Sequence, residues 1–178
     1  MLGPNQSDED QRCAEVSGGR GGEEIMYSYI LVPLDGSERA EAILPHVEEL
    51  AKRYDAQVIL LQVVEAAPLH TEPEGAARAL GQQELERHTE QALSYLSTVQ
   101  DEFRSKDIDA RTVVYYGPVV QAIIRAAECE YADLIAMASH GRTGMSQVFY
   151  GSVTAGVLHR IDRPLLLVRA PVTEEGGK

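Results

Sequence analysis

The chain has 178 residues, of which 44% are hydrophobic, and its formal net charge is −12. That length and apolar content suit a single domain with one core and leave little room for a second. A strongly acidic chain repels DNA and anionic membranes, so we expect neither as a partner.

Two further classes are disfavoured by simple features. No apolar run approaches the roughly 20 residues that cross a bilayer, and the N-terminus shows no positive region followed by an apolar one. The chain has two cysteines, Cys13 and Cys129, which is too few for a disulfide framework. We therefore expect a reduced, cytoplasmic protein.

The two ends differ in composition from the middle of the chain. Residues 1–24 are rich in Gly, Ser, Asp and Glu and lack periodic apolar residues, so we predict a disordered leader there. Residues 172–178 have a similar composition and are predicted to be a flexible tail. The range 25–171 is the predicted domain.

Within this domain, short apolar runs alternate with helical patterns. The runs are rich in β-branched residues or Leu and are predicted to be strands, at 27–34, 56–64, 109–116, 133–138 and 164–170. Segments with apolar residues three and four apart are predicted to be helices, and they follow Ser37, cover 75–105, cover 119–127 and follow Gly151.

Two of these helices allow more detail. Ser37 is the predicted N-cap of the first, and Pro45 inside its pattern requires either a late start or a kink. The long second helix is predicted to turn a set of large apolar residues toward the core, namely Leu80, Leu85, Leu93, Leu96 and Phe103.

The alternation of strands and helices determines the fold class. Crossover helices between near-continuously apolar strands indicate a parallel sheet that is covered on both faces. We predict an α/β fold of the Rossmann-like or flavodoxin-like kind, with five parallel strands in the order 3-2-1-4-5. Ligands of such sheets bind where the strand order reverses, so the loops after Leu34 and after Ala138 should face one crevice.

The loop after Ala138 has the chemistry of an anion site. Gly141 and Gly151 bracket nine residues, and Ser152 begins a helix whose free amides would attract a phosphate. Arg142 adds a positive charge, and Asp35 on the facing loop could bind ribose hydroxyls or a metal ion. Each residue also has an ordinary structural explanation, since glycines permit turns, Ser152 can be a simple N-cap and Asp35–Gly36 is a common turn pair.

Residues 27 to about 171 resemble a universal stress protein domain. The resemblance lies in YILVPLDGSERAEAIL, in VILLQVV and in DLIAMASHGRTGMSQVFYGSVTAGVLHRIDRPLLLVR. Nucleotide-binding members carry Gly, two residues, Gly, nine residues, and then Gly with Ser or Thr. This chain has Ala138, Gly141, Gly151 and Ser152 at those positions, so Ala138 is its one departure.

The resemblance implies ATP as the ligand, with Mg²⁺ to offset its charge. Asp35 would hold the ribose or adenine side in a pocket shaped by Pro33 and Leu34, and the backbone of Val63 would meet the adenine edge. Met137 and Ala138 would line the base of the phosphate loop. The triphosphate would be received by the amides of Gly141, Arg142, Gly151, Ser152 and Val153, together with the Ser152 hydroxyl.

The resemblance also implies a homodimer that pairs through the last strand, Pro164 to Ala170. We expect an ATP-responsive regulatory dimer of the stress response, with protein partners that the sequence does not identify. No Ser–His–Asp set, HExxH or CxxC is visible, so at most a slow ATPase or autophosphorylating activity is expected. The alternatives are a dimeric interaction module that binds no nucleotide, which Ala138 favours, and a slow ATP hydrolase.

Overall fold

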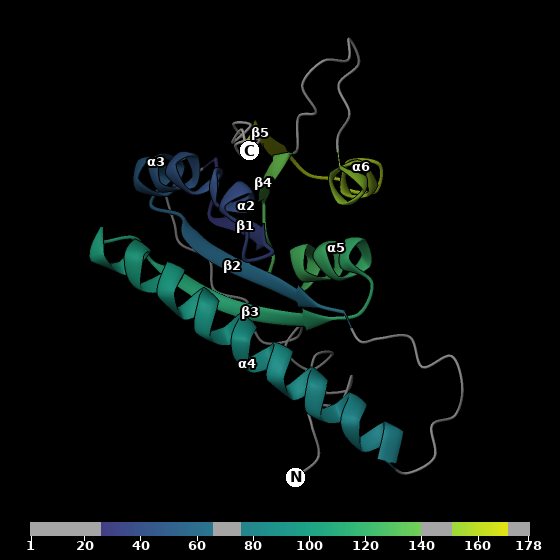
Figure 1. The fold of residues 1–178 in the computed structure, drawn as a ribbon. Coiled ribbons are helices and arrows are strands. Elements are labelled where there is room, and N and C mark those ends of the chain that lie inside the picture. Colours follow the sequence, from purple (N-terminus) through teal and green to yellow (C-terminus); the bar gives the residue numbers. More distant parts are fainter. Residues whose placement is uncertain (1–25, 66–75, 140–150, 171–178) are drawn as a thin grey trace, which may run out of the picture.

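The computed structural model describes residues 26–65, 76–139 and 151–170. Five strands form one parallel sheet in the order β3-β2-β1-β4-β5 (Figure 1). They are β1 (Tyr29–Leu34), β2 (Gln57–Val64), β3 (Ala110–Tyr116), β4 (Leu134–Ser139) and β5 (Leu165–Arg169). The predicted fold class and strand order are confirmed, whereas the predicted leader 1–24 and tail 172–178 lie outside the described residues.

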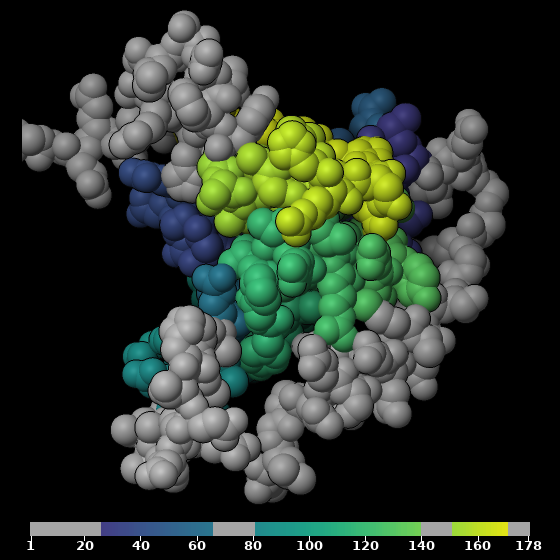
Figure 2. Space-filling view, turned by 90° about the vertical axis from the view of Figure 1, so that its right-hand side faces the viewer, coloured from purple at the N-terminus to yellow at the C-terminus, as the bar shows by residue number. Residues whose placement is uncertain are grey.

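Helices cover both faces of the sheet, as predicted. One face is covered by α2 (Glu38–Glu41), α3 (Leu44–Tyr54) and α4 (Ala76–Ser105), and the other by α5 (Val119–Cys129) and α6 (Ser152–Leu158). Alternate residues of each strand enter the two cores: Ile30 and Val32 pack toward α3 and α4, whereas Leu31 packs toward α5. Of these helices, α5 and α6 lie side by side on the face shown in Figure 2.

The first predicted helix is divided in two by the backbone around Pro45. Ser37 caps α2, because its Oγ accepts a hydrogen bond from the Ala40 amide at 3.2 Å. Pro45 has no N–H to donate to a carbonyl one turn earlier, so α3 begins afresh at Leu44 with Pro45 in its first turn. The predicted helix therefore starts directly after Ser37 and is interrupted just before Pro45, so it breaks there rather than starting late.

The long helix α4 buries only part of the predicted stripe: Leu96 and Phe103 are in the core, Leu85 and Leu93 are not, and the side chain of Leu80 lies outside the described residues. Its buried residues are Ala92, Leu96, Val99 and Phe103, which are spaced three and four apart. Leu93 was predicted to be in the core but is 47% exposed. No side chain from 81 to 91 is buried, because these turns extend past the edge of the sheet (Figure 1).

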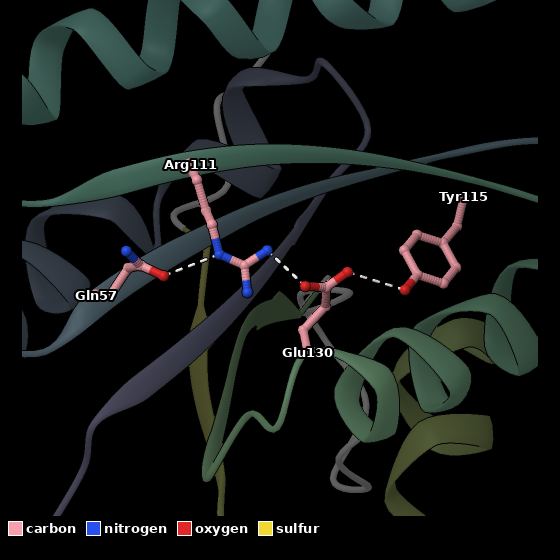
Figure 3. A network of polar contacts seen from close by, with 4 residues as sticks. All are labelled: Gln57, Arg111, Tyr115 and Glu130. Carbon is pink, nitrogen blue, oxygen red and sulfur yellow. Dashed lines mark hydrogen bonds and ion pairs between the residues drawn. The ribbon is translucent and has the colours of Figure 1, made fainter. Parts of the chain in front are cut away.

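A chain of polar contacts ties the beginnings of β2 and β3 to the end of α5 (Figure 3). Arg111 donates to Gln57 Oε1 at 2.9 Å and forms an ion pair with Glu130, which follows α5. Glu130 is only 8% exposed as a residue, and its carboxylate also accepts from the Tyr115 hydroxyl at 3.0 Å. The buried carboxylate thus has charged and neutral donors, as a buried charge requires.

Cys129, the last residue of α5, departs from the expectation of a reduced protein. Cys129 is disulfide-bonded, and its partner lies outside the described residues. The expectation of reduced cysteines is therefore wrong for Cys129, because sequence separation says nothing about which cysteines approach within bonding distance. Among the helices in the described ranges, none is long and apolar enough to span a membrane.

Candidate functional site

The crevice predicted at the reversal of strand order is present between β1 and β4. Their pairing covers only Ile30 with Leu134 and Leu31 with Ile135. Beyond these pairs, β1 continues beside β2 and β4 continues beside β5. Pro33 has no N–H to donate toward β4, so the ladder does not continue there and the strands separate toward their carboxyl ends.

A cavity of about 290 Å³ occupies this crevice. It lies at the carboxyl ends of the central strands, where ligands of open α/β sheets bind. Every predicted site residue within the described ranges lines it, namely Pro33, Leu34, Asp35, Val63, Met137, Ala138, Gly151, Ser152 and Val153. The predicted residues Gly141 and Arg142 lie outside the described ranges.

The cavity has one largely apolar side. It is lined by Leu61 and Val63 from β2, Val119 and Ile123 from α5 and Met137 from β4, which all belong to one hydrophobic cluster. These side chains offer a surface on which a flat, weakly polar group such as a nucleobase loses its contact with water. The described polar side chains of the cavity come from elements other than β2 and α5, and they are Asp35, Arg39, Ser139, Ser152 and Thr154.

Asp35 is held in place by the turn that follows β1. Its Oδ1 accepts hydrogen bonds from the Ser37 amide at 3.0 Å and the Ser37 hydroxyl at 2.6 Å. Gly36 between them has φ +80°, a conformation that glycine adopts at low cost. Both bonds use Oδ1, so Oδ2 remains available to accept from hydroxyl groups of a ligand.

The short helix α2, which lines one side of the cavity, is tied to the helix layer behind it. The Tyr95 hydroxyl, on α4, donates to Glu41 Oε1 at 2.9 Å. Burial raises the pKa of Tyr95 above its ordinary value of 10.0, and the neighbouring Glu41 and Asp35 carboxylates raise it further. The hydroxyl therefore stays protonated at neutral pH and keeps its bond to α2.

The position of α6, on the opposite side, is determined by contact with α5. Gly156 lies so close to Val120 that a Cβ at this residue would be 2.8 Å from Val120 Cγ2. Thr154 and Val157 of α6 are also buried, and Val157 belongs to the same core cluster as α5. Because the helix is short, this contact determines where Gly151 and Ser152 meet the cavity.

Several lining residues were missed by the sequence analysis. They are Arg39, Ala40, Leu61, Val119, Ile123, Ser139 and Thr154. Some had a readable signal: Leu61 is two residues from Val63 on the same strand face, and Val119 and Ile123 are one helical turn apart. Arg39 had no such signal, because its place beside the cavity depends on how α2 packs against β4 and β1.

A comparison with known protein families identifies the family to which a chain with this fold and cavity belongs. A family model described as "Universal stress protein family" matches residues 26–169. The chain belongs to the universal stress protein family. The match spans all five strands of the sheet and the cavity between β1 and β4.

Curated members of the family match over most of their length. Universal stress protein MJ0577 of Methanocaldococcus jannaschii is 29% identical over 156 residues, which are 82% of this chain and 96% of that protein. Universal stress protein MJ0531 of the same organism is 30% identical over 151 residues, with coverage of 85% and 87%.

Solved structures of the family share the fold. The structure of MJ0577 matches with a TM-score of 0.71 at 28% identity, covering 84% of this chain and 100% of that one. The universal stress protein UspA from Lactobacillus plantarum matches with a TM-score of 0.69 at 25% identity, covering 80% and 98%. These proteins are similar to this chain along nearly their whole length.

Proposed function

We propose that this universal stress protein binds ATP, with Mg²⁺, in the crevice between β1 and β4 and acts as a nucleotide-responsive regulatory homodimer of the cytoplasmic stress response. One observation carries the proposal: the loop after β1 and the start of α6, far apart in sequence, line one cavity at the reversal of strand order. A cavity at this place in an open α/β sheet is the expected location of a nucleotide site.

The cavity offers a separate surface for each part of a nucleotide. The apolar side formed by Leu61, Val63 and Ile123 suits the adenine ring, and Asp35 Oδ2 suits a ribose hydroxyl. The amides of Gly151, Ser152 and Val153 and the Ser152 hydroxyl remain the predicted phosphate ligands within the described ranges.

Nucleotides are bound by other proteins of this fold. One universal stress protein was solved in complex with cAMP, and the Archaeoglobus fulgidus protein was solved in complex with dAMP. Both match with a TM-score of 0.55, at 20% and 18% identity respectively, so their likeness to this chain concerns the fold. The choice of ATP here rests on the resemblance of this sequence to the nucleotide-binding members of the family.

The donor set is compatible with a magnesium ion that arrives with the nucleotide. Asp35 is the only carboxylate among the described residues of the cavity, and the described ranges hold no cluster of three metal-ligating side chains. Mg²⁺ commonly takes one or two carboxylates and completes its shell with phosphates and water. Asp35 would therefore be its candidate protein ligand.

Ala138 stands where the family motif has glycine, but its methyl group obstructs a bound phosphate less than this position suggests. Strand residues alternate between faces, and the Ala138 methyl packs against the core cluster on the side of α2, α3 and α4. The start of α6, with Ser152, lies on the other side, where Met137 points. This placement supports ATP binding over the alternative of a module that binds no nucleotide.

Release of bound nucleotide from the purified full-length protein tests the proposal. The protein is denatured, and the released nucleotide is identified by chromatography and mass spectrometry, for wild type and Gly151→Val. Gly151 has φ −54° and ψ 155°, which any residue can adopt, so the substitution adds bulk at the cavity without backbone strain. Gly81→Val is the matched control, because nothing lies within 4 Å of a Cβ at this helical position.

We expect near-stoichiometric ATP or ADP from the wild type and the control, and none from Gly151→Val. A wild type that releases no nucleotide, and binds none when millimolar ATP is added, would contradict the proposal. Steady ATP turnover that is lost on changing Asp35 or Ser152 would instead favour the ATP hydrolase.

The homodimer is proposed to form through β5. This strand is at the edge of the sheet, and Leu165 to Val168 are only half-buried although they are apolar. An exposed apolar edge strand favours pairing with a second chain. Light scattering at micromolar concentration should give twice the chain mass of 19.5 kDa, and a monomer mass would contradict the dimer.

A further inference from the structure

Arg39, on α2, is the only cationic side chain among the described residues that line the cavity. Asp35 is the only described acidic one, so the two formal charges of the cavity cancel. The whole chain has a net charge of −12, which opposes the approach of an anion. Any anionic ligand of this cavity therefore depends on a local cation.

The guanidinium of Arg39 is not engaged by its acidic neighbours. The Glu41 carboxylate accepts from the Tyr95 hydroxyl, and Asp35 Oδ1 accepts twice from Ser37. Arg39 is exposed and forms no ion pair or hydrogen bond with any residue in the described ranges. Arg111 and Arg163, in contrast, are held by structural partners. Arg39 can thus turn to a ligand without breaking a contact of the fold.

The place of α2 indicates which part of a nucleotide Arg39 would reach. Helix α2 packs against β4 and β1, whereas the apolar side of the cavity is built from β2 and α5. A base that lies against β2 and α5 leaves its sugar and phosphates to the remaining lining of the cavity, which comes from β4, from the start of α6 and from α2 with Arg39. A planar guanidinium with paired N–H donors is well matched to phosphate oxygens.

We propose that Arg39 binds a phosphate group of the nucleotide and gives the cavity its preference for phosphorylated ligands over the bare nucleoside. This inference rests on the proposed nucleotide-binding function. Among the described residues, Arg39 supplies the positive charge that balances the phosphate.

Calorimetric titration of the full-length protein with adenosine, AMP and ATP tests the assignment at one fixed salt concentration. Arg39→Gln removes the charge, and Arg39→Lys keeps it without the paired donors. Arg160→Gln is the matched control, because Arg160 is also exposed but follows the far end of α6, away from the cavity. Thermal melts of all four proteins check that the fold is unchanged.

We expect Arg39→Gln to weaken AMP and ATP binding by about tenfold to hundredfold, as for a lost hydrogen bond between charged groups, and to leave adenosine binding unchanged. Arg39→Lys should lose less, and Arg160→Gln should match the wild type. Equal losses for adenosine and ATP would place Arg39 on the base and overturn the assignment. Unchanged ATP affinity would also overturn it, with nucleotide binding itself intact. A wild type that binds none of the three ligands would instead refute the proposed function, and the assignment with it.

Discussion

Adding one methyl group at Gly156 tests whether close contact determines the position of α6. In Gly156→Ala the new Cβ would lie 2.8 Å from Val120 Cγ2 and 3.2 Å from Val120 Cγ1. Rotating the valine side chain cannot clear both methyl groups, so α6 must move away from α5. Overpacking of this kind costs about 1–3 kcal/mol, and the better helix propensity of alanine returns up to about 1 kcal/mol. The net loss of unfolding free energy should be about 1–2 kcal/mol.

Urea denaturation followed by circular dichroism measures this loss, and two further variants make the result specific. Gly81→Ala places the same methyl group in open space on α4 and should stabilise the protein by about 0.5–1 kcal/mol. In the double variant Gly156→Ala with Val120→Ala the contact is gone, so the combined loss should be smaller than the sum of the single losses. Additive losses, or a Gly156→Ala protein that gains stability as Gly81→Ala does, would refute the reasoning.

Two further predictions concern groups that hold the framework of the site. Folding raises the pKa of Tyr95, so its protonated hydroxyl contributes fully to the free energy of unfolding below the ordinary pKa of 10.0. This contribution is lost as the pH rises from that value toward the pKa of the folded state. Tyr95→Phe should therefore remove part of the alkaline fall in unfolding free energy, and identical pH profiles for the two proteins would contradict this. Glu130→Ala leaves the charge of Arg111 without its ion pair and should cost about 2–3 kcal/mol in urea denaturation, whereas the exposed control Asp101→Asn should cost less than about 0.5 kcal/mol. Equal costs for these two variants would show that the buried network does not stabilise the α5 end.

Much of the site followed from local sequence. Asp35 comes directly after a buried strand, Ser37 can cap the helix that follows, and Gly151 precedes a helical pattern. Such features depend on residues within one or two turns of each other, so a linear pattern records them. The resemblance to the family then connected segments more than a hundred residues apart, and the structure places Asp35 and Ser152 around one cavity.

The sequence by itself determined the kind and approximate bounds of the elements, apart from the division of the first predicted helix, because alternation and helical spacing of apolar residues are local properties of the chain. Only the tertiary structure decided which stripe of α4 is buried, that β1 and β4 separate after Leu31, and that Arg39 lines the cavity between them. These features depend on distances between elements that are remote in sequence. Such distances result from how the helices pack on a twisted sheet, and no pattern within a single segment records them.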